Sequence, residues 1–125
     1  MGGNHENWKC YTDIIIAVVS SDTVIIKDVQ DALDFAMSVQ YETNAERIIL
    51  NQEALSDDFY HLKTRLAGEI LQKFVNYHIK VAIYGDFRQY MSQSFHDFVY
   101  ESNHGKNFFF VGTKEEALYQ LINVV

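Results

Sequence analysis

The feature that most constrains this chain is the alternation of short β-branched runs with longer segments of helical periodicity. Short, mainly apolar runs occupy residues 14–19, 47–50, 79–84 and 108–111. Because strands buried on both faces have unbroken apolar sequences, these runs are typical of a largely parallel sheet. The helical segments between them would form right-handed crossovers that cover the sheet. The sequence therefore predicts an α/β fold.

The N-terminal half of the chain predicts a hairpin and two helices. Residues 23–26 follow a Ser-Asp turn, and we expect them to pair with residues 14–19. Asp28 is a favourable N-cap for the helix after this hairpin. A long helix is expected over residues 58–77, where apolar residues recur at every fourth position: Leu62, Leu66, Ile70 and Phe74.

Capping signals predict the last two helices. Ser94 and Asp97 resemble a capping box, and Thr113 and Glu116 form a regular one before the final helix. The complete plan consists of a mostly parallel central sheet of about five strands, with an N-terminal hairpin and about four helices.

The length and composition indicate one domain with an aromatic core. The chain has 125 residues, which is the usual size of a single domain. Hydrophobic residues make up 48% of it, and eight Tyr and nine Phe supply large side chains for the interior. We expect residues 13–125 to form a single domain and the polar residues 1–12 to form a flexible arm.

Charge and cysteine content exclude several classes of partner and site. The formal net charge is −7 and no run of Lys and Arg is present, so neither nucleic acid nor an anionic membrane is an expected partner. Cys10 is the only cysteine, which excludes an internal disulfide and a cysteine-rich zinc site. The N-terminus lacks the basic start and apolar stretch of a signal peptide, so a cytoplasmic location is expected.

Enzyme motifs are scarce in this sequence. The six glycines are dispersed, which argues against a P-loop and a dinucleotide fingerprint. No nucleophile elbow is present. The five histidines lack the close spacing that is typical of metal ligands. We therefore expect no catalytic residue, no metal and no cofactor.

One group of polar residues is a candidate site for partner binding and regulation. Lys63, Thr64 and Arg65 lie near the N-terminal end of the expected long helix, and Asp57 and Asp58 precede them. A helix N-terminus favours added negative charge, so phosphate on Thr64 would be tolerated between the two cations. In the structural alternative, the basic residues form an ordinary exposed turn and the two aspartates interact with the helix dipole.

A second group is a candidate for a ligand pocket. Asp86 and Phe87 follow Gly85 at the end of an expected strand, and ligands of open α/β sheets bind at the carboxyl ends of strands. Together with Glu101 and Asn103, they could supply polar groups to an aromatic-walled pocket. In the alternative, Gly85 and Asp86 form an ordinary turn, and Glu101 and Asn103 finish a helix.

Three blocks of sequence resemble a known family. They are LAGEILQKF at residues 66–74, YHIKVAIYGDF at residues 77–87 and YESNHG at residues 100–105. In this order they are similar to a family of small bacterial proteins defined only as a domain of unknown function (DUF4180). The resemblance covers about residues 14–122. It implies a bacterial or phage source and no particular activity.

The order of the elements is also similar to that of STAS domains, the fold of anti-sigma-factor antagonists. In those proteins, a strand and a short loop precede a phosphorylated hydroxyl residue at the start of a helix, and a leucine follows. Here residues 48–51 resemble the strand, Thr64 stands for the hydroxyl residue and Leu66 follows soon after. Asn51 stands where the family usually has aspartate, and Arg65 where it usually has glycine.

These observations lead to three hypotheses about function. The first is a non-enzymatic regulatory or protein-interaction module that binds a protein partner near the start of the long helix. The second is a small-molecule-binding protein or an enzyme that uses a pocket at the strand ends near Asp86. The third is an obligate homodimer whose apolar helix face forms the platform for function.

Overall fold

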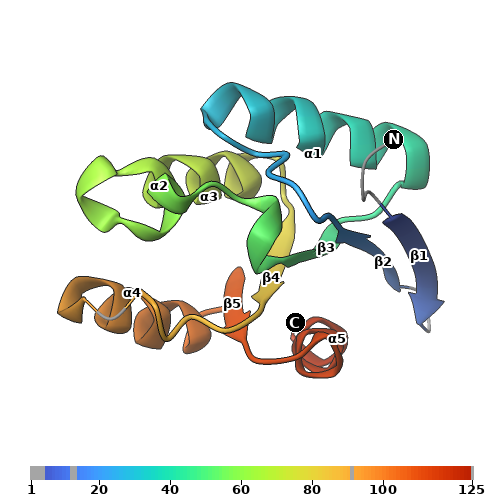
Figure 1. Cartoon of the computed structure of the whole chain (residues 1–125). Coiled ribbons are helices and arrows are strands. Elements are labelled where there is room, and N and C mark those ends of the chain that lie inside the picture. The colour runs from blue at the N-terminus through green and yellow to red at the C-terminus, as the bar shows by residue number, and fades with distance from the viewer. Residues whose placement is uncertain (1–4, 12–13, 91, 125) are drawn as a thin grey trace.

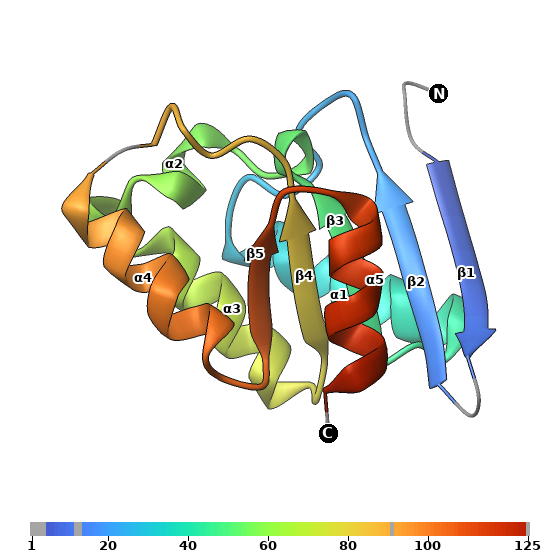
Figure 2. The same cartoon turned by 90° about the horizontal axis from the view of Figure 1, so that it is seen from below.

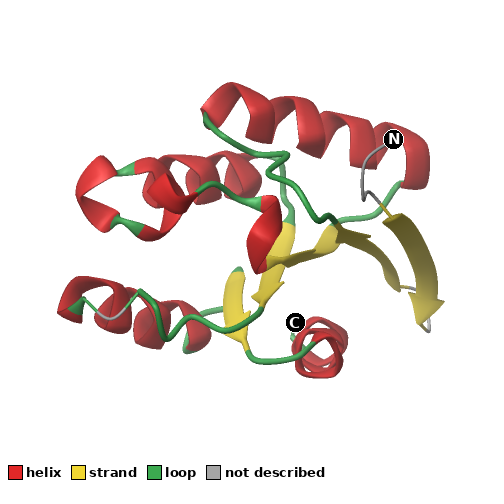
Figure 3. Cartoon of the chain, viewed as in Figure 1, coloured by secondary structure: helices red, strands yellow, loops and turns green. Residues whose placement is uncertain are grey.

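The computed structural model describes residues 5–11, 14–90 and 92–124, and of residues 5–11 the backbone alone. Within these ranges, the chain forms an α/β fold of five strands and five α-helices (Figures 1 and 3). In chain order they are β1 (His5–Tyr11), β2 (Ile14–Ser20), α1 (Val29–Thr43), β3 (Arg47–Asn51), α2 (Asp57–Tyr60), α3 (Leu66–Asn76), β4 (Lys80–Tyr84), α4 (Gln93–Asn103), β5 (Phe108–Val111) and α5 (Lys114–Asn123). Two short 3-10 helices, η1 (Gln52–Ala54) and η2 (Leu62–Thr64), flank α2.

The strands of the described residues form one sheet with the order β1-β2-β3-β4-β5. β1 pairs with β2 in an antiparallel manner, whereas β2, β3, β4 and β5 are parallel to one another. The prediction of an α/β fold with a largely parallel sheet is therefore confirmed. Each parallel strand pairs with the next one along the chain, so every crossover connects adjacent strands.

Residues in register across the parallel strands alternate between two cores, one on each face of the sheet. One row packs into the larger core with α1, α2, α3 and α4: Val19, Leu50, Ile83 and Phe110. The adjacent row packs into a smaller core with α5: Val18, Ile49, Ala82 and Phe109. Figure 2 shows α5 in front of the sheet, with α1 and α3 behind it.

The N-terminal hairpin differs from the expected one. The partner of β2 is β1, which lies within the segment expected to be a flexible arm; residues 1–4 and 12 of that segment lie outside the described residues. Residues 23–26 form no regular strand, and Figure 3 shows loop between β2 and α1. Ile26 is fully buried and makes an isolated parallel bridge to Leu55. Its side chain packs into the larger core beyond the end of β2. The segment is therefore apolar although it is not a strand, and this explains why its sequence resembled one.

The prediction of a single helix over residues 58–77 is wrong for the first half of this range. The chain breaks at Arg65, which has a left-handed φ of 65°, and α3 begins at the next residue. Thr64 hydrogen-bonds to backbone groups on both sides of the break, and such local bonds compete with a continuous helix. The break separates α2 from α3. As a result, the described residues form five α-helices and not the expected four.

Side-chain caps fix the starts of three helices. Asp28 caps α1 as predicted, because its carboxylate accepts a hydrogen bond from a first-turn N–H at 2.8 Å. Thr113 and Glu116 form the predicted capping box of α5. The N-cap of α4 is Ser92 and not Ser94, so this helix begins earlier than expected. Each cap satisfies backbone N–H groups that a helix leaves without an internal partner.

Arg47 anchors the last turn of α5 to the sheet. Its guanidinium donates to the carbonyl of Leu121 and, at 3.0 Å, to that of Val124. Helix C-termini carry unsatisfied carbonyl groups and partial negative charge, so a cation at this position is favourable. The side chain therefore connects the start of β3 to the end of a helix far along the chain.

Candidate functional site

Polar loops follow β2, β3 and β4 at one edge of the sheet, because the carboxyl ends of parallel strands lie together. Asn51, at the end of β3, connects two of these loops. Its amide donates to the carbonyl of Ser21 at 2.7 Å and accepts from the Ser21 N–H at 2.9 Å. The same amide donates to the carboxylate of Glu53 at 3.0 Å. Open α/β sheets bind ligands at this edge, so it is the candidate site.

Gln52 fixes the loop after β4 to the loop after β3. Its side chain is only 6% exposed, and its Oε1 accepts a hydrogen bond from the Asp86 N–H at 2.8 Å. Its backbone carbonyl accepts from the hydroxyl of Tyr60, also at 2.8 Å. Gly85 lies against this side chain, where an added Cβ would be 2.6 Å from both Cβ and Oε1 of Gln52. The two loops therefore meet at a contact that needs glycine.

Aromatic rings from α2, the loop after β4, α4 and β5 pack together beside this contact. The rings are those of Tyr60, Phe87, Tyr90, Phe95 and Phe110. Tyr60 and Tyr90 are stacked, with ring centroids 4.4 Å apart and planes inclined by 17°. The hydroxyl of Tyr90 donates to the carboxylate of Asp57 at 2.9 Å. Burial and then this bond raise the pKa of Tyr90, and burial is the main cause that raises the pKa of Tyr60.

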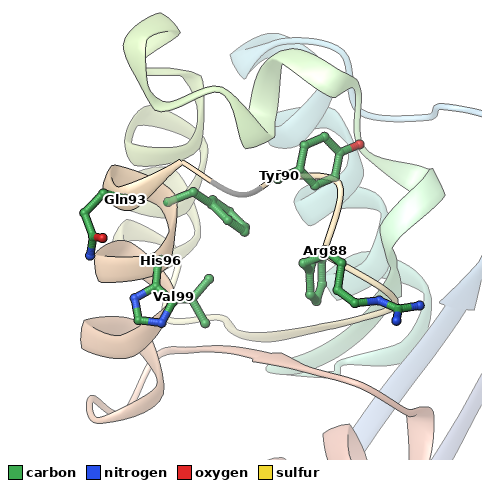
Figure 4. Close-up of a pocket in the computed structure, with 7 residues that line it drawn as sticks. Arg88, Tyr90, Gln93, His96 and Val99 are labelled. Carbon is green, nitrogen blue, oxygen red and sulfur yellow. The ribbon is translucent and has the colours of Figure 1, made fainter.

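An open pocket of about 400 Å³ lies between the loop after β4 and α4, and we call it the aromatic pocket. It is lined by Phe87, Arg88, Tyr90, Gln93, Phe95, His96 and Val99. Figure 4 shows Arg88 and Tyr90 on the loop, across from Gln93, His96 and Val99 on α4. The hydroxyl of Tyr90 and the guanidinium of Arg88 both point away from α4 in this view.

A second hollow, of about 320 Å³, is also lined by Tyr90, and we call it the acidic hollow. It is lined by Asp22, Thr23, Val24, Gln52, Glu53, Leu55, Asp57, Gln89 and Tyr90. These residues come from the loops after β2, β3 and β4, together with the first residue of α2. Sequence reasoning found Asp57 among them but missed Gln52 and Tyr90.

The residues expected to bind a partner are exposed and lie in one segment of the chain, residues 57–65, within which Phe59 and Tyr60 are buried. Lys63, Thr64 and Arg65 connect α2 to α3, and Asp57 and Asp58 form the first turn of α2. Asp57 bonds to Tyr90 and so belongs to the acidic hollow as well. The short α2 therefore lies between the acidic hollow and the connection that carries Thr64.

The hydroxyl of Thr64 holds this connection in its fold. It lies 2.8 Å from the carbonyl oxygens of both Asp58 and His61, which share its single hydrogen. It also accepts a hydrogen bond from the N–H of Leu66, the first residue of α3, at 3.2 Å. One side-chain oxygen thus ties the start of α3 to the end of α2.

We expect Arg65→Gly to raise the free energy of unfolding by about 0.5–1 kcal/mol. An L-residue in the left-handed region costs roughly 1–2 kcal/mol, and glycine avoids this cost but loses more chain entropy on folding. Chemical denaturation of the two proteins measures the difference. Arg65→Ala is the matched control, because it removes the same side chain but keeps the strain. If Arg65→Ala stabilises the fold as much as Arg65→Gly, strain at this residue is not the cause.

The four residues expected to form a ligand pocket lie in different surroundings. Phe87 lines the aromatic pocket, whereas Glu101 borders a separate shallow hollow beside the end of α4. Asn103 holds β5, since its amide accepts from the Phe110 N–H at 2.8 Å and donates to the Phe110 carbonyl at 3.0 Å. Asp86 forms an exposed two-pronged ion pair with Arg88.

We expect Arg88→Gln to move the pKa of Asp86 from about 2 towards its ordinary value of 3.8. The side chain of Arg88, followed by its backbone N–H, stabilises the carboxylate and lowers this pKa. Because the folded-state pKa is lowered, the pair stabilises the fold above pH 3.8, and this contribution is lost as the pH falls towards 2. A carboxyl ¹³C NMR titration measures the pKa directly. An unchanged Asp86 titration in Arg88→Gln would contradict the expectation, and Arg88→Lys should be intermediate.

The described residues contain neither a metal-ligand cluster nor a membrane-spanning helix. No group of three or more His, Cys, Asp or Glu side chains among them is placed to hold a metal ion. None of the helices they form has the length and apolar character that crossing a bilayer requires.

A family model with the description "Domain of unknown function (DUF4180)" matches residues 12–121 of this chain. The chain belongs to the DUF4180 family. No curated protein matches it. The part of this DUF4180 chain that matches runs from before β2 into α5, so it includes the three loops of the candidate site. The description of the family names no activity.

Proposed function

We propose that this DUF4180 chain is a non-enzymatic regulatory module that binds a protein partner. The binding surface would consist of α2, η2 and the first turn of α3, with Lys63, Thr64 and Arg65 as its centre and Asp57 and Asp58 at its border. The order of the elements and the position of Thr64 resemble those of STAS domains, the anti-sigma-factor-antagonist fold. On this proposal the protein acts in the bacterial cytoplasm.

The observation that carries the proposal is the bonding of the Thr64 hydroxyl. Its donated bonds to Asp58 and His61 hold an exposed connection that contains a left-handed residue. A kinase that transferred a phosphoryl group to Oγ1 would displace the hydroxyl hydrogen, so both carbonyls would lose their donor. The phosphate would carry almost two negative charges beside these carbonyls and would attract Lys63 and Arg65. Modification would therefore change both the shape and the charge of the surface.

Affinity purification from the native host, with mass spectrometry, identifies the partner and reports phosphate on Thr64. The affinity of the purified partner is then measured for the wild type, Thr64→Ser and Thr64→Glu. We expect Thr64→Ser to bind as the wild type does, because it keeps the hydroxyl. Thr64→Glu should change the affinity by about tenfold, because it adds charge and removes the donor.

Glu115→Gln is a suitable control for a distant change of charge, because Glu115 is exposed in the first turn of α5. It should bind as the wild type does. The proposal is wrong if Thr64→Glu retains wild-type affinity for every partner, or if no partner co-purifies reproducibly with the wild type.

A further inference from the structure

We infer that the aromatic pocket and the acidic hollow together bind a small organic cation that carries an aromatic or bulky apolar group. This ligand site shares Asp57 with the border of the proposed partner surface, but it requires neither partner binding nor modification of Thr64. It lies where the carboxyl ends of β2, β3 and β4 meet, which is the usual place for ligands on open α/β sheets. Its two parts, of about 400 and 320 Å³, each have the size of a small-molecule site.

Tyr90 connects the two cavities because it lines both of them. Its ring is held against Tyr60 by stacking, and its hydroxyl donates to Asp57 in the acidic hollow. Figure 4 shows this hydroxyl pointing away from α4. A ligand that lies across Tyr90 would thus contact aromatic rings at one end and carboxylates at the other.

The aromatic pocket fits the apolar end of such a ligand. Phe87, Tyr90, Phe95 and Val99 supply most of its apolar lining. Phe95 is 2% exposed and packs edge-on against Tyr60 and Tyr90, so neighbouring rings hold this wall in place. Aromatic rings pair favourably with such walls when they stack or meet them edge to face.

Arg88 also lines this pocket, and a free guanidinium there would favour an anion. Here the guanidinium is paired with Asp86 through contacts of 2.7 and 2.9 Å. Figure 4 shows it directed away from α4. Its charge is therefore compensated, so it does not select a carboxylate or phosphate ligand.

The acidic hollow fits the cationic end. Asp22, Glu53 and Asp57 line it, and none of the nine residues that line it is basic. One carboxylate oxygen of Glu53 accepts from Asn51 and one of Asp57 accepts from Tyr90, so both groups are oriented and each has a second oxygen. The buried Gln52 adds a fixed polar wall. Oriented carboxylates are complementary to an ammonium or a guanidinium group.

The test is a titration of the ¹⁵N-labelled full chain with phenethylamine, followed by NMR. Two matched probes separate the parts of the ligand: 3-phenylpropionate keeps the ring and reverses the charge, and butylamine keeps the ammonium and lacks the ring. Phenethylamine should cause saturable shifts at residues 22–24, 52–57, 87–90 and 93–99. Both other probes should bind about tenfold more weakly, and added salt should weaken phenethylamine binding.

Two variants test the two cavities separately. Asp57→Asn should weaken phenethylamine binding several-fold and should not weaken 3-phenylpropionate binding, because it removes a charge that repels this anion, whereas Val99→Phe should weaken both by filling the aromatic pocket. Glu115→Gln, which removes one charge on α5, should bind as the wild type does. The spectrum of each variant reports whether it is folded, and Gln93→Phe replaces Val99→Phe if that variant is not.

Three outcomes would overturn the inference. Equal binding of phenethylamine and 3-phenylpropionate would show that the carboxylates do not select charge. Equal binding of butylamine would show that the aromatic pocket contributes nothing. The absence of saturable shifts at these residues up to the solubility limit of phenethylamine would show that the site does not bind this class of ligand.

Discussion

Gly85→Ala should lower the free energy of unfolding by about 3 kcal/mol, although it adds a single methyl group. The new Cβ would lie 2.6 Å from two atoms of the buried Gln52, and overpacking of this kind costs roughly 1–3 kcal/mol. The backbone φ of 157° adds strain, because L side chains rarely adopt it. If Gln52 moves away, the Asp86 N–H loses its acceptor. Urea denaturation measures the loss, and the melting temperature should fall by roughly 10 °C.

Gly68→Ala is the matched control for this change. Gly68 lies in the first turn of α3, and an added Cβ there would meet nothing within 4 Å. Alanine is the better helix former, so this variant should be more stable than the wild type by about 0.5–1 kcal/mol. If Gly85→Ala is as stable as the wild type, the contact between Gly85 and Gln52 does not constrain the two loops.

Phe95→Ala should cost about 3–5 kcal/mol, the range for removing a buried phenylalanine. Its ring is 2% exposed and contacts four other rings, those of Tyr60, Phe87, Tyr90 and Phe110. The loss is a large part of the 5–15 kcal/mol that typically separates folded from unfolded domains. Urea unfolding followed by circular dichroism measures it, and the slope with denaturant tests whether the transition remains two-state.

Phe98→Ala, on the same helix, is the control for Phe95→Ala. Phe98 is partly buried and contacts one aromatic ring, that of Phe110. Its removal should cost roughly half as much, because less apolar surface returns to water. Equal losses for the two variants would mean that α4 docks as a whole and that the ring cluster around Phe95 has no special role.

Local patterns were sufficient to predict most of the fold. The strand at residues 108–111 and the capping box of Thr113 and Glu116 depend on near neighbours in the chain, and both are present as predicted. Asp28 caps α1 for the same reason. The parallel arrangement followed from unbroken apolar strands, because only a sheet covered on both faces needs them.

Two features of the fold, the strand β1 and the break before α3, depend on contacts that the spacing of apolar residues does not reveal. β1 is an edge strand, and its polar sequence gains order from backbone pairing with β2. The four-residue spacing from Leu62 to Leu66 continues through a break, because both segments face the same core. The hydrogen bonds of Thr64 and the left-handed Arg65 end the regular helix between them. Amphipathic spacing indicated which residues are buried but not whether one helix carries them all.

The candidate site was predictable in position but not in composition. The sequence indicated the carboxyl ends of the strands, and the residues found there include Asp57, Asp86 and Phe87. Gln52 and Tyr90 were missed, because each acquires its role through segments distant in the sequence. Gly85 was the available signal, since a glycine directly after a buried strand often marks close approach of another group.

The position of α5 has a consequence for synthesis on the ribosome. Ile16, Ile49, Ala82 and Phe109 lie on a face of the sheet that, in the described part of the chain, is covered by α5 alone. α5 follows all five strands along the chain, so strands that leave the exit tunnel before it have this face still bare. Exposed apolar surface of this kind promotes association between nascent chains. Cells should therefore need to shield the growing polypeptide until the last helix docks and Arg47 bonds to its end.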